Sequence, residues 1–104
     1  MRKLETEFNK SIFTYRQLNR TDKVAIYEQT FEDNVISYEV FKIRVGKEQE
    51  VFGTTIPNRE KFCSDEDFGQ TAWSIRDKDR ATTKFKQLVN EEVHKKRYQY
   101  TTVI

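Results

Sequence analysis

The chain has 104 residues, which suits one domain, because two hydrophobic cores of half that size would each be too small to be stable. Its 19 basic and 17 acidic residues are finely mixed and leave a net charge of +2, which argues against a protein that coats bulk DNA. Aromatic residues make up 13% of the chain and proline occurs once, which excludes a disordered polypeptide and indicates an aromatic core over a single domain, residues 1–104.

The N-terminal part predicts a polar start followed by a strand. Residues 1–10 are polar apart from Leu4 and Phe8; we expect a frayed lead-in, although these two have the i, i+4 spacing of a helical turn. Residues 12–18 are rich in β-formers, which predicts a strand, and the polar residues 19–22 predict a turn.

A β-hairpin is the clearest local prediction. Residues 23–31 and 35–45 have strand composition, and the polar break over residues 32–34 has the length of a hairpin loop. In the longer strand apolar residues alternate with cations: Phe41, Lys42, Ile43, Arg44 and Val45. This alternation predicts a sheet with one face on the core and the other in water.

The middle of the chain predicts a turn over residues 46–48 and a further strand over residues 50–56. Pro57 would end that strand, because proline cannot donate to a sheet. Gly53 lies inside the same run and indicates a bulge or a close approach of the backbone.

Residues 57–76 predict an irregular segment that contains one helical turn. Ser64 precedes three acidic residues, as an N-cap precedes the first turn of a helix, and Gly69 would end that turn. Three large apolar side chains are expected to fold this segment back onto the sheet: Phe62, Phe68 and Trp73.

Residues 77 to about 97 predict one long helix, with Asp77 or Asp79 capping its start. Its apolar stripe consists of Ala81, Phe85, Leu88, Val89 and Val93. Residues 98–104 have strand composition, and we expect a tail or an edge strand that could pair two copies as a homodimer. The predicted fold is therefore α+β: a three- to four-stranded antiparallel meander with one long C-terminal helix packed on one face.

Few side chains suit catalysis. His94 is the one histidine and lies near the end of the predicted helix, where a cation complements the helix dipole. Cys63 is the one cysteine, which rules out an internal disulfide, and we expect it to be a small buried apolar residue. The acids of residues 65–67 are consecutive, unlike the alternating ligands of a calcium loop. We expect no enzymatic activity, no catalytic residues, no metal and no cofactor.

Basic residues of the predicted helix are the first candidate binding site. Residues 76–104 carry eight basic groups against four acidic ones, and aromatic residues follow the last cations. Cations neutralise phosphates while aromatic rings stack on unpaired bases, so this combination is typical of nucleic-acid binding. The alternative is an ordinary charged helix face in water. The candidate residues are Arg76, Arg80, Lys84, Lys95, Lys96, Arg97 and Tyr98.

A second candidate site lies on the predicted hairpin. Tyr38, Lys42 and Arg44 share the side of the strand opposite Phe41 and Ile43. An aromatic residue beside two cations on an open sheet face is a platform of the kind that binds single-stranded RNA. The alternative is that these are ordinary outward-facing strand residues.

Several short motifs distributed over residues 24–88 resemble a group of short, uncharacterised proteins of tailed bacteriophages. The motifs are Val24-Ala25-Ile26-Tyr27, Tyr38-Glu39-Val40, Val51-Phe52-Gly53, Pro57 with Glu60 and Phe62, Asp67-Phe68-Gly69 with Ala72-Trp73, and Ala81 with Phe85 and Leu88. The resemblance implies a phage origin and expression in the cytoplasm of a bacterial host. It implies no activity and no site residues, and the shared positions are of the kind that form cores and turns.

Two functions are compatible with these observations. The first is a small non-catalytic phage accessory protein that binds and modulates a host or phage protein, for example by blocking a defence system. The second is a small RNA- or single-stranded-DNA-binding protein that uses the basic outer face of the helix. The first residues carry positive charge without the apolar stretch of a secretion signal, and no apolar run approaches the roughly 18 residues of a membrane helix. We therefore expect a cytoplasmic protein without membrane contact.

Overall fold

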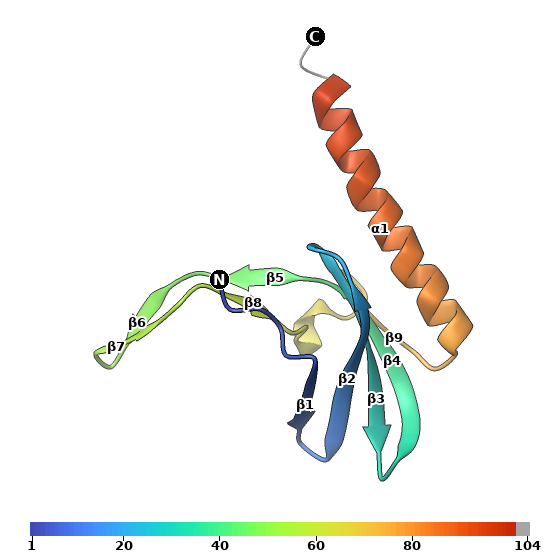
Figure 1. The fold of residues 1–104 in the computed structure, drawn as a ribbon, viewed down its shortest axis with the longest axis horizontal. Coiled ribbons are helices and arrows are strands. Elements are labelled where there is room, and N and C mark those ends of the chain that lie inside the picture. The colour runs from blue at the N-terminus through green and yellow to red at the C-terminus, as the bar shows by residue number, and fades with distance from the viewer. Residues whose placement is uncertain (102–104) are drawn as a thin grey trace.

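The computed structural model describes the backbone of residues 1–101 and the side chains of residues 1–94. It confirms the α+β class: an antiparallel sheet stands beside one long C-terminal helix (Figure 1). The sheet has five strands in the order β1-β2-β3-β4-β9, and is therefore larger than the predicted three to four. These strands are β1 (Glu7–Lys10), β2 (Phe13–Arg20), β3 (Val24–Phe31), β4 (Asn34–Lys42) and β9 (Ala72–Ile75).

The predicted hairpin forms β3 and β4. Glu32 and Asp33 connect the two strands with φ angles of 49° and 66°, the left-handed conformation that a two-residue hairpin turn of type I′ requires. Residues 24–27 and 37–41 are buried without interruption, because β3 and β4 are covered on both faces. The expectation of one wet sheet face is therefore wrong.

The expectation of a frayed lead-in is also wrong, because residues 7–10 form β1. Phe8 lies opposite Tyr15 of β2, and their rings stack with centroids 5.2 Å apart. Leu4 packs against the same core cluster. Two apolar residues therefore suffice to hold the start of the chain on the sheet, since both find aromatic neighbours there.

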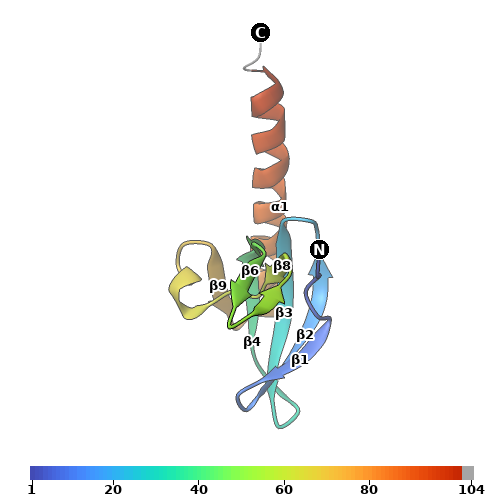
Figure 2. The same cartoon turned by 90° about the vertical axis from the view of Figure 1, so that its left-hand side faces the viewer.

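One face of the sheet is covered by α1 (Lys78–Thr101), which contacts β3, β4 and β9. The core between them contains Val24, Ile26, Tyr38, Val40, Ala81, Phe85 and Leu88. The predicted stripe is confirmed for its first members, whereas Val93 is 46% exposed because the helix has by then passed beyond the sheet (Figures 1 and 2).

The two ends of α1 differ in how well they match prediction. Asp77 caps the start, where its carboxylate accepts a hydrogen bond of 2.9 Å from the backbone N–H of Arg80. The helix continues to Thr101, so the predicted edge strand is wrong for residues 98–101. Residues 102–104 lie outside the described part of the chain.

The other face of the sheet is covered by the segment around Phe62 and Cys63. Phe62 is the centre of an aromatic cluster, with ring centroids 4.8–5.1 Å from those of four neighbours: Phe8, Tyr15, Tyr27 and Phe41. Cys63 and Ala72 complete this second core. The prediction that this segment folds back onto the sheet is confirmed for Phe62 and for Trp73, whereas Phe68 stays partly exposed.

The predicted helical turn is confirmed as a 3-10 turn, η1 (Asp65–Asp67). The Asp67 carboxylate accepts a hydrogen bond of 2.9 Å from the backbone N–H of Ser64, which lowers the pKa of Asp67. Gly69 has a φ of +87°, consistent with its predicted role as a terminator. The irregular segment over residues 57–76 nonetheless contains β9, an unpredicted edge strand that pairs with β4.

Between β4 and η1 the chain leaves the sheet as a long two-stranded ribbon, which we call the arm (residues 44–61). At its root β5 (Arg44–Gly46) pairs with β8 (Arg59–Lys61), and further out β6 (Gln49–Val51) pairs with β7 (Thr54–Ile56). Figure 1 shows the arm extending away from the sheet. The predicted strand over residues 35–45 is confirmed as β4, but it is interrupted at Ile43 and its last residues belong to β5. The predicted turn over residues 46–48 is wrong, and the predicted single strand over residues 50–56 is instead a hairpin, although β7 does end before Pro57.

Candidate functional site

Of the basic residues expected on the helix, Arg80 and Lys84 lie on α1, whereas Arg76 does not. Arg76 lies in the connection between β9 and α1, before the helix begins. Arg80 and Lys84 do share one shallow groove of about 340 Å³ with Ile75 of β9. The Lys84 ammonium lies 4.0 Å from the centroid of the Trp73 ring, so it is engaged in a cation–π contact. The side chains of Lys95, Lys96, Arg97 and Tyr98 lie outside the described residues.

The predicted sheet platform is not formed. Tyr38 is 7% exposed and packs beneath α1, so its ring is not available for stacking on a base. Lys42 is half-buried at the end of β4, opposite Val24. Arg44 belongs to the arm instead, and its guanidinium lies 3.4 Å from the Asp67 carboxylate. Both sheet faces are used for packing, and this leaves no open platform at Tyr38.

The residues with potential for covalent or metal chemistry are dispersed. Cys63 is buried, and burial raises the pKa of its thiol to about 12, which keeps the sulfur protonated and unreactive. His94 is exposed on α1. Within the described residues no group of three or more His, Cys, Asp or Glu side chains is placed to hold a metal ion. No helix in the same part of the chain is long and apolar enough to cross a bilayer.

The tip of the arm carries an unusual residue. Phe52 and Gly53 form the two-residue turn between β6 and β7 with φ angles of 50° and 78°. Such turns favour Asn, Asp or Gly, and a residue with a β-carbon in the left-handed region costs roughly 1–2 kcal/mol. The exposed fraction of Phe52 is 102%, so the ring gains no packing within the chain. The aromatic side chain therefore occupies a strained backbone position, and no burial within the chain offsets that cost.

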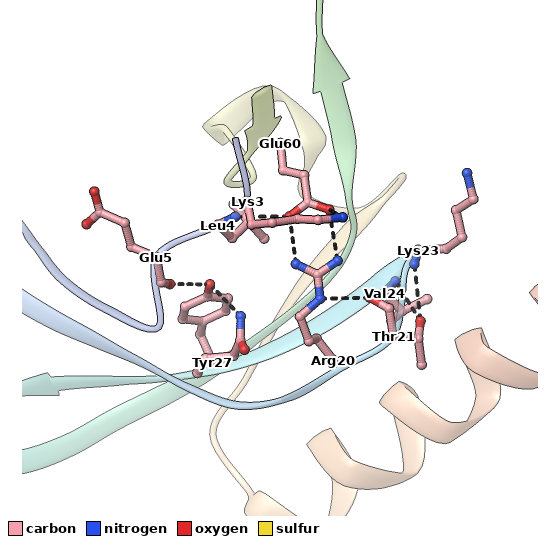
Figure 3. Close-up of polar contacts among 10 residues, drawn as sticks. Lys3, Leu4, Glu5, Arg20, Thr21, Lys23, Val24, Tyr27 and Glu60 are labelled. Atoms are coloured by element: carbon pink, nitrogen blue, oxygen red, sulfur yellow. Dashed lines mark hydrogen bonds and ion pairs between the residues drawn. The ribbon is translucent and has the colours of Figure 1, made fainter. Parts of the chain in front are cut away.

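The root of the arm is fixed to the sheet by a buried ion pair (Figure 3). The Arg20 guanidinium at the end of β2 donates two hydrogen bonds to the Glu60 carboxylate of β8, at 2.6 and 2.8 Å. The backbone N–H of Leu4 donates a third, at 3.0 Å, and the Lys3 ammonium lies 3.7 Å away. The hydrogen bond from Arg20 is the main reason that the pKa of Glu60 falls to about 2.

The N-terminal segment also pairs with the arm. The backbone N–H of Arg2 donates to the Asn58 carbonyl at 3.1 Å, and the N–H of Glu60 donates to the Arg2 carbonyl at 2.8 Å. The Arg59 guanidinium of β8 lies over Gly46 of the opposite strand β5, where a β-carbon would approach it to 3.1 Å. The root is therefore a two-stranded sheet to which the N-terminal segment is joined by one parallel bridge at Arg2.

A cavity of about 400 Å³ opens between the N-terminal segment and the arm root. Its apolar lining consists of Leu4, Phe8 and Phe62. Three cations line it as well: Arg2, Lys3 and Arg59. The Nη1 atom of Arg59 is buried and has no hydrogen-bond acceptor among the described residues. We refer to this site as the root cavity, and it is large enough for a small ligand or one inserted side chain.

Comparison of the chain with profiles of known protein families, with curated protein sequences and with solved structures finds no match. The candidate site is therefore defined by geometry alone: the arm carries Phe52 at its tip and the root cavity at its base. Sequence reasoning missed the arm because Phe-Gly lacks the Asn-Gly or Asp-Gly signature of a two-residue hairpin turn. The available signal was the large apolar residue directly before Gly53.

Proposed function

We propose that the protein is a non-catalytic binding protein that docks onto a partner protein through Phe52 at the tip of its arm. One observation carries this proposal: Phe52 is fully exposed in a strained backbone conformation. Buried aromatic side chains are among the residues that contribute most to protein interfaces. A partner with an apolar pocket would supply the burial that the ring lacks within its own chain.

The arm root supports this role because it limits the entropy lost on docking. The Arg20–Glu60 pair and the backbone bonds of Arg2 attach the base of the arm to the sheet and to the N-terminal segment before any partner arrives. Preorganisation of this kind improves affinity by lowering the cost of ordering the interface. The resemblance to short phage proteins supports a phage origin and a partner that is a host or phage protein in a bacterial cytoplasm.

Nucleic-acid binding is the second candidate. It is favoured by the groove between α1 and β9 that Arg80 and Lys84 line together with Ile75. Mobility shift of labelled RNA and single-stranded DNA across a salt series tests it, with the Arg80→Glu variant as a comparison. Binding that weakens steeply with salt and is lost in the variant supports this candidate. Absence of a shift at low salt rules it out.

Site-specific photocrosslinking tests the docking proposal. A benzoylphenylalanine residue replaces Phe52 in one variant and Ile12 in a control, because Ile12 is also apolar and 65% exposed but lies in the turn before β2. We expect irradiation of expressing bacterial cells to yield a discrete protein adduct from position 52 and none from position 12. Equal adducts from both positions, or none from position 52, would refute the proposal.

A further inference from the structure

The arm tip and the root cavity lie at opposite ends of one two-stranded ribbon. Phe52 at the tip lies six positions after Gly46 at the root, which corresponds to about 20 Å of extended strand. The ribbon points away from the sheet, so Phe52 is far from the cavity of its own chain (Figure 1). An exposed aromatic ring and an apolar-lined cavity are thus present on the same molecule.

We propose that Phe52 of one copy inserts into the root cavity of a second copy. This inference rests on the proposed docking function of Phe52 and names its partner as this same chain. The apolar lining of the cavity fits the ring, since Phe8 and Phe62 already meet edge to face with centroids 5.0 Å apart. An incoming aromatic side chain would extend that cluster in the geometry that aromatic pairs prefer.

The charges around the two surfaces are complementary. The outer part of the arm (residues 47–56) carries two exposed acids, Glu48 and Glu50, and one cation, Lys47. The cavity presents Arg2, Lys3 and Arg59, whereas its acids are Glu5 and the Glu60 carboxylate that Arg20 already neutralises. Opposite charges on the two sides orient the contact and disfavour the reverse pairing.

The proposed contact joins two different surfaces, so it is heterologous rather than two-fold symmetric. Each copy retains a free tip or a free cavity after one contact, and association continues until a ring closes or a chain grows. The expected assembly is at least a dimer: two reciprocal contacts close a ring of two copies, and contacts that are not reciprocal build a larger ring or a chain.

Sedimentation velocity over a range from micromolar to millimolar chain tests this inference. We expect the wild-type chain to associate with rising concentration and Phe52→Asn to stay monomeric, a loss of at least tenfold in association. Asparagine is chosen because it tolerates the left-handed conformation of this turn. A second monomeric variant is Asn9→Trp, since Asn9 is exposed on β1 and lines the cavity, where a larger side chain would block entry.

Mixing the two variants gives the sharpest outcome. Phe52→Asn retains a free cavity and Asn9→Trp retains a free tip, so their mixture should form one-to-one dimers that cannot grow further. A monomeric wild type at all concentrations, association that persists in Phe52→Asn, or a mixture that stays monomeric would each overturn the inference. If the wild type is monomeric but position 52 crosslinks to a different protein, the inference of a second copy fails and the proposed docking function stands. If the wild type is monomeric and position 52 gives no adduct, the inference and the proposed function both fail.

Discussion

Arg20 and Glu60 form a nearly buried bidentate ion pair that joins the end of β2 to the root of the arm across 40 positions of sequence. Arg16 and Glu28 form another ion pair within the same sheet, at 3.0 Å, but the Arg16 side chain is 61% exposed. The two pairs therefore provide a matched comparison between a buried and an exposed contact.

Replacing Arg20 by alanine should lower the free energy of unfolding by about 3 kcal/mol, because it leaves the buried Glu60 carboxylate without its guanidinium. The Arg16→Ala variant should lose less than about 1 kcal/mol, since water and salt screen an exposed pair. Urea denaturation followed by circular dichroism measures both. Equal losses in the two variants would show that burial does not distinguish these pairs.

Acid should remove the stabilisation that Glu60 provides. Its folded pKa of about 2 lies below the ordinary value of 4.5, so between these values the unfolded chain binds more protons than the folded one. The free energy of unfolding should fall as the pH drops from about 4.5 toward 2. Urea titrations at several pH values should show a weaker acid dependence in Glu60→Gln; an unchanged dependence would contradict this assignment.

Glu39 should produce the opposite pH dependence. Glu39 belongs to β4, which lies between β3 and β9, and its side chain is buried. Its Oε2 atom has no hydrogen-bond partner among the described residues. Burial raises the pKa of this carboxyl above the ordinary value of 4.5. The folded chain therefore retains a proton that the unfolded chain releases, and stability should decline as the pH rises above 4.5. Glu39→Gln should lack this decline in urea titrations. A decline of the same size in wild type and variant would refute the prediction.

Phe62 lies in the second core and Phe52 is exposed at the arm tip, so substitutions at these two positions should change stability in opposite directions. Phe62→Ala should cost about 3 kcal/mol, because Phe62 contacts four aromatic rings of the second core. Phe52→Asn should instead raise the free energy of unfolding by about 1 kcal/mol, since it relieves the strained conformation and removes no packing. Thermal unfolding measures both variants, and a destabilised Phe52→Asn would show that the tip serves the fold.

The sequence pattern predicts the fold best where local signals agree. The β3–β4 hairpin follows from β-branched and aromatic runs on either side of the polar residues 32–34, and α1 follows from the Ala81, Phe85 and Leu88 spacing with Asp77 before it. Such signals act over a few residues and need no knowledge of distant partners.

Contacts between distant segments could not be predicted in this way. Gln29 of β3 and Ser37 of β4 are polar, yet they are buried and hydrogen-bonded to each other at 2.8 Å, a contact that depends on how the two strands are paired. The alternation around Tyr38 predicts an open sheet face. The local sequence does not show that α1 packs over β4 and covers this side chain. The arm depends on four strands of three residues each, which are too short to leave a periodic pattern.

The most direct test of the central claim follows the environment of position 52 during association. Phe52→Trp in a Trp73→Phe background places the one tryptophan of the chain at the arm tip. Its fluorescence should be that of a solvent-exposed indole in dilute solution and should shift to the blue when a Trp73→Phe chain with an intact root cavity is added in excess. Emission that remains that of a solvent-exposed indole at every concentration of added chain would contradict the burial of the tip in a second copy.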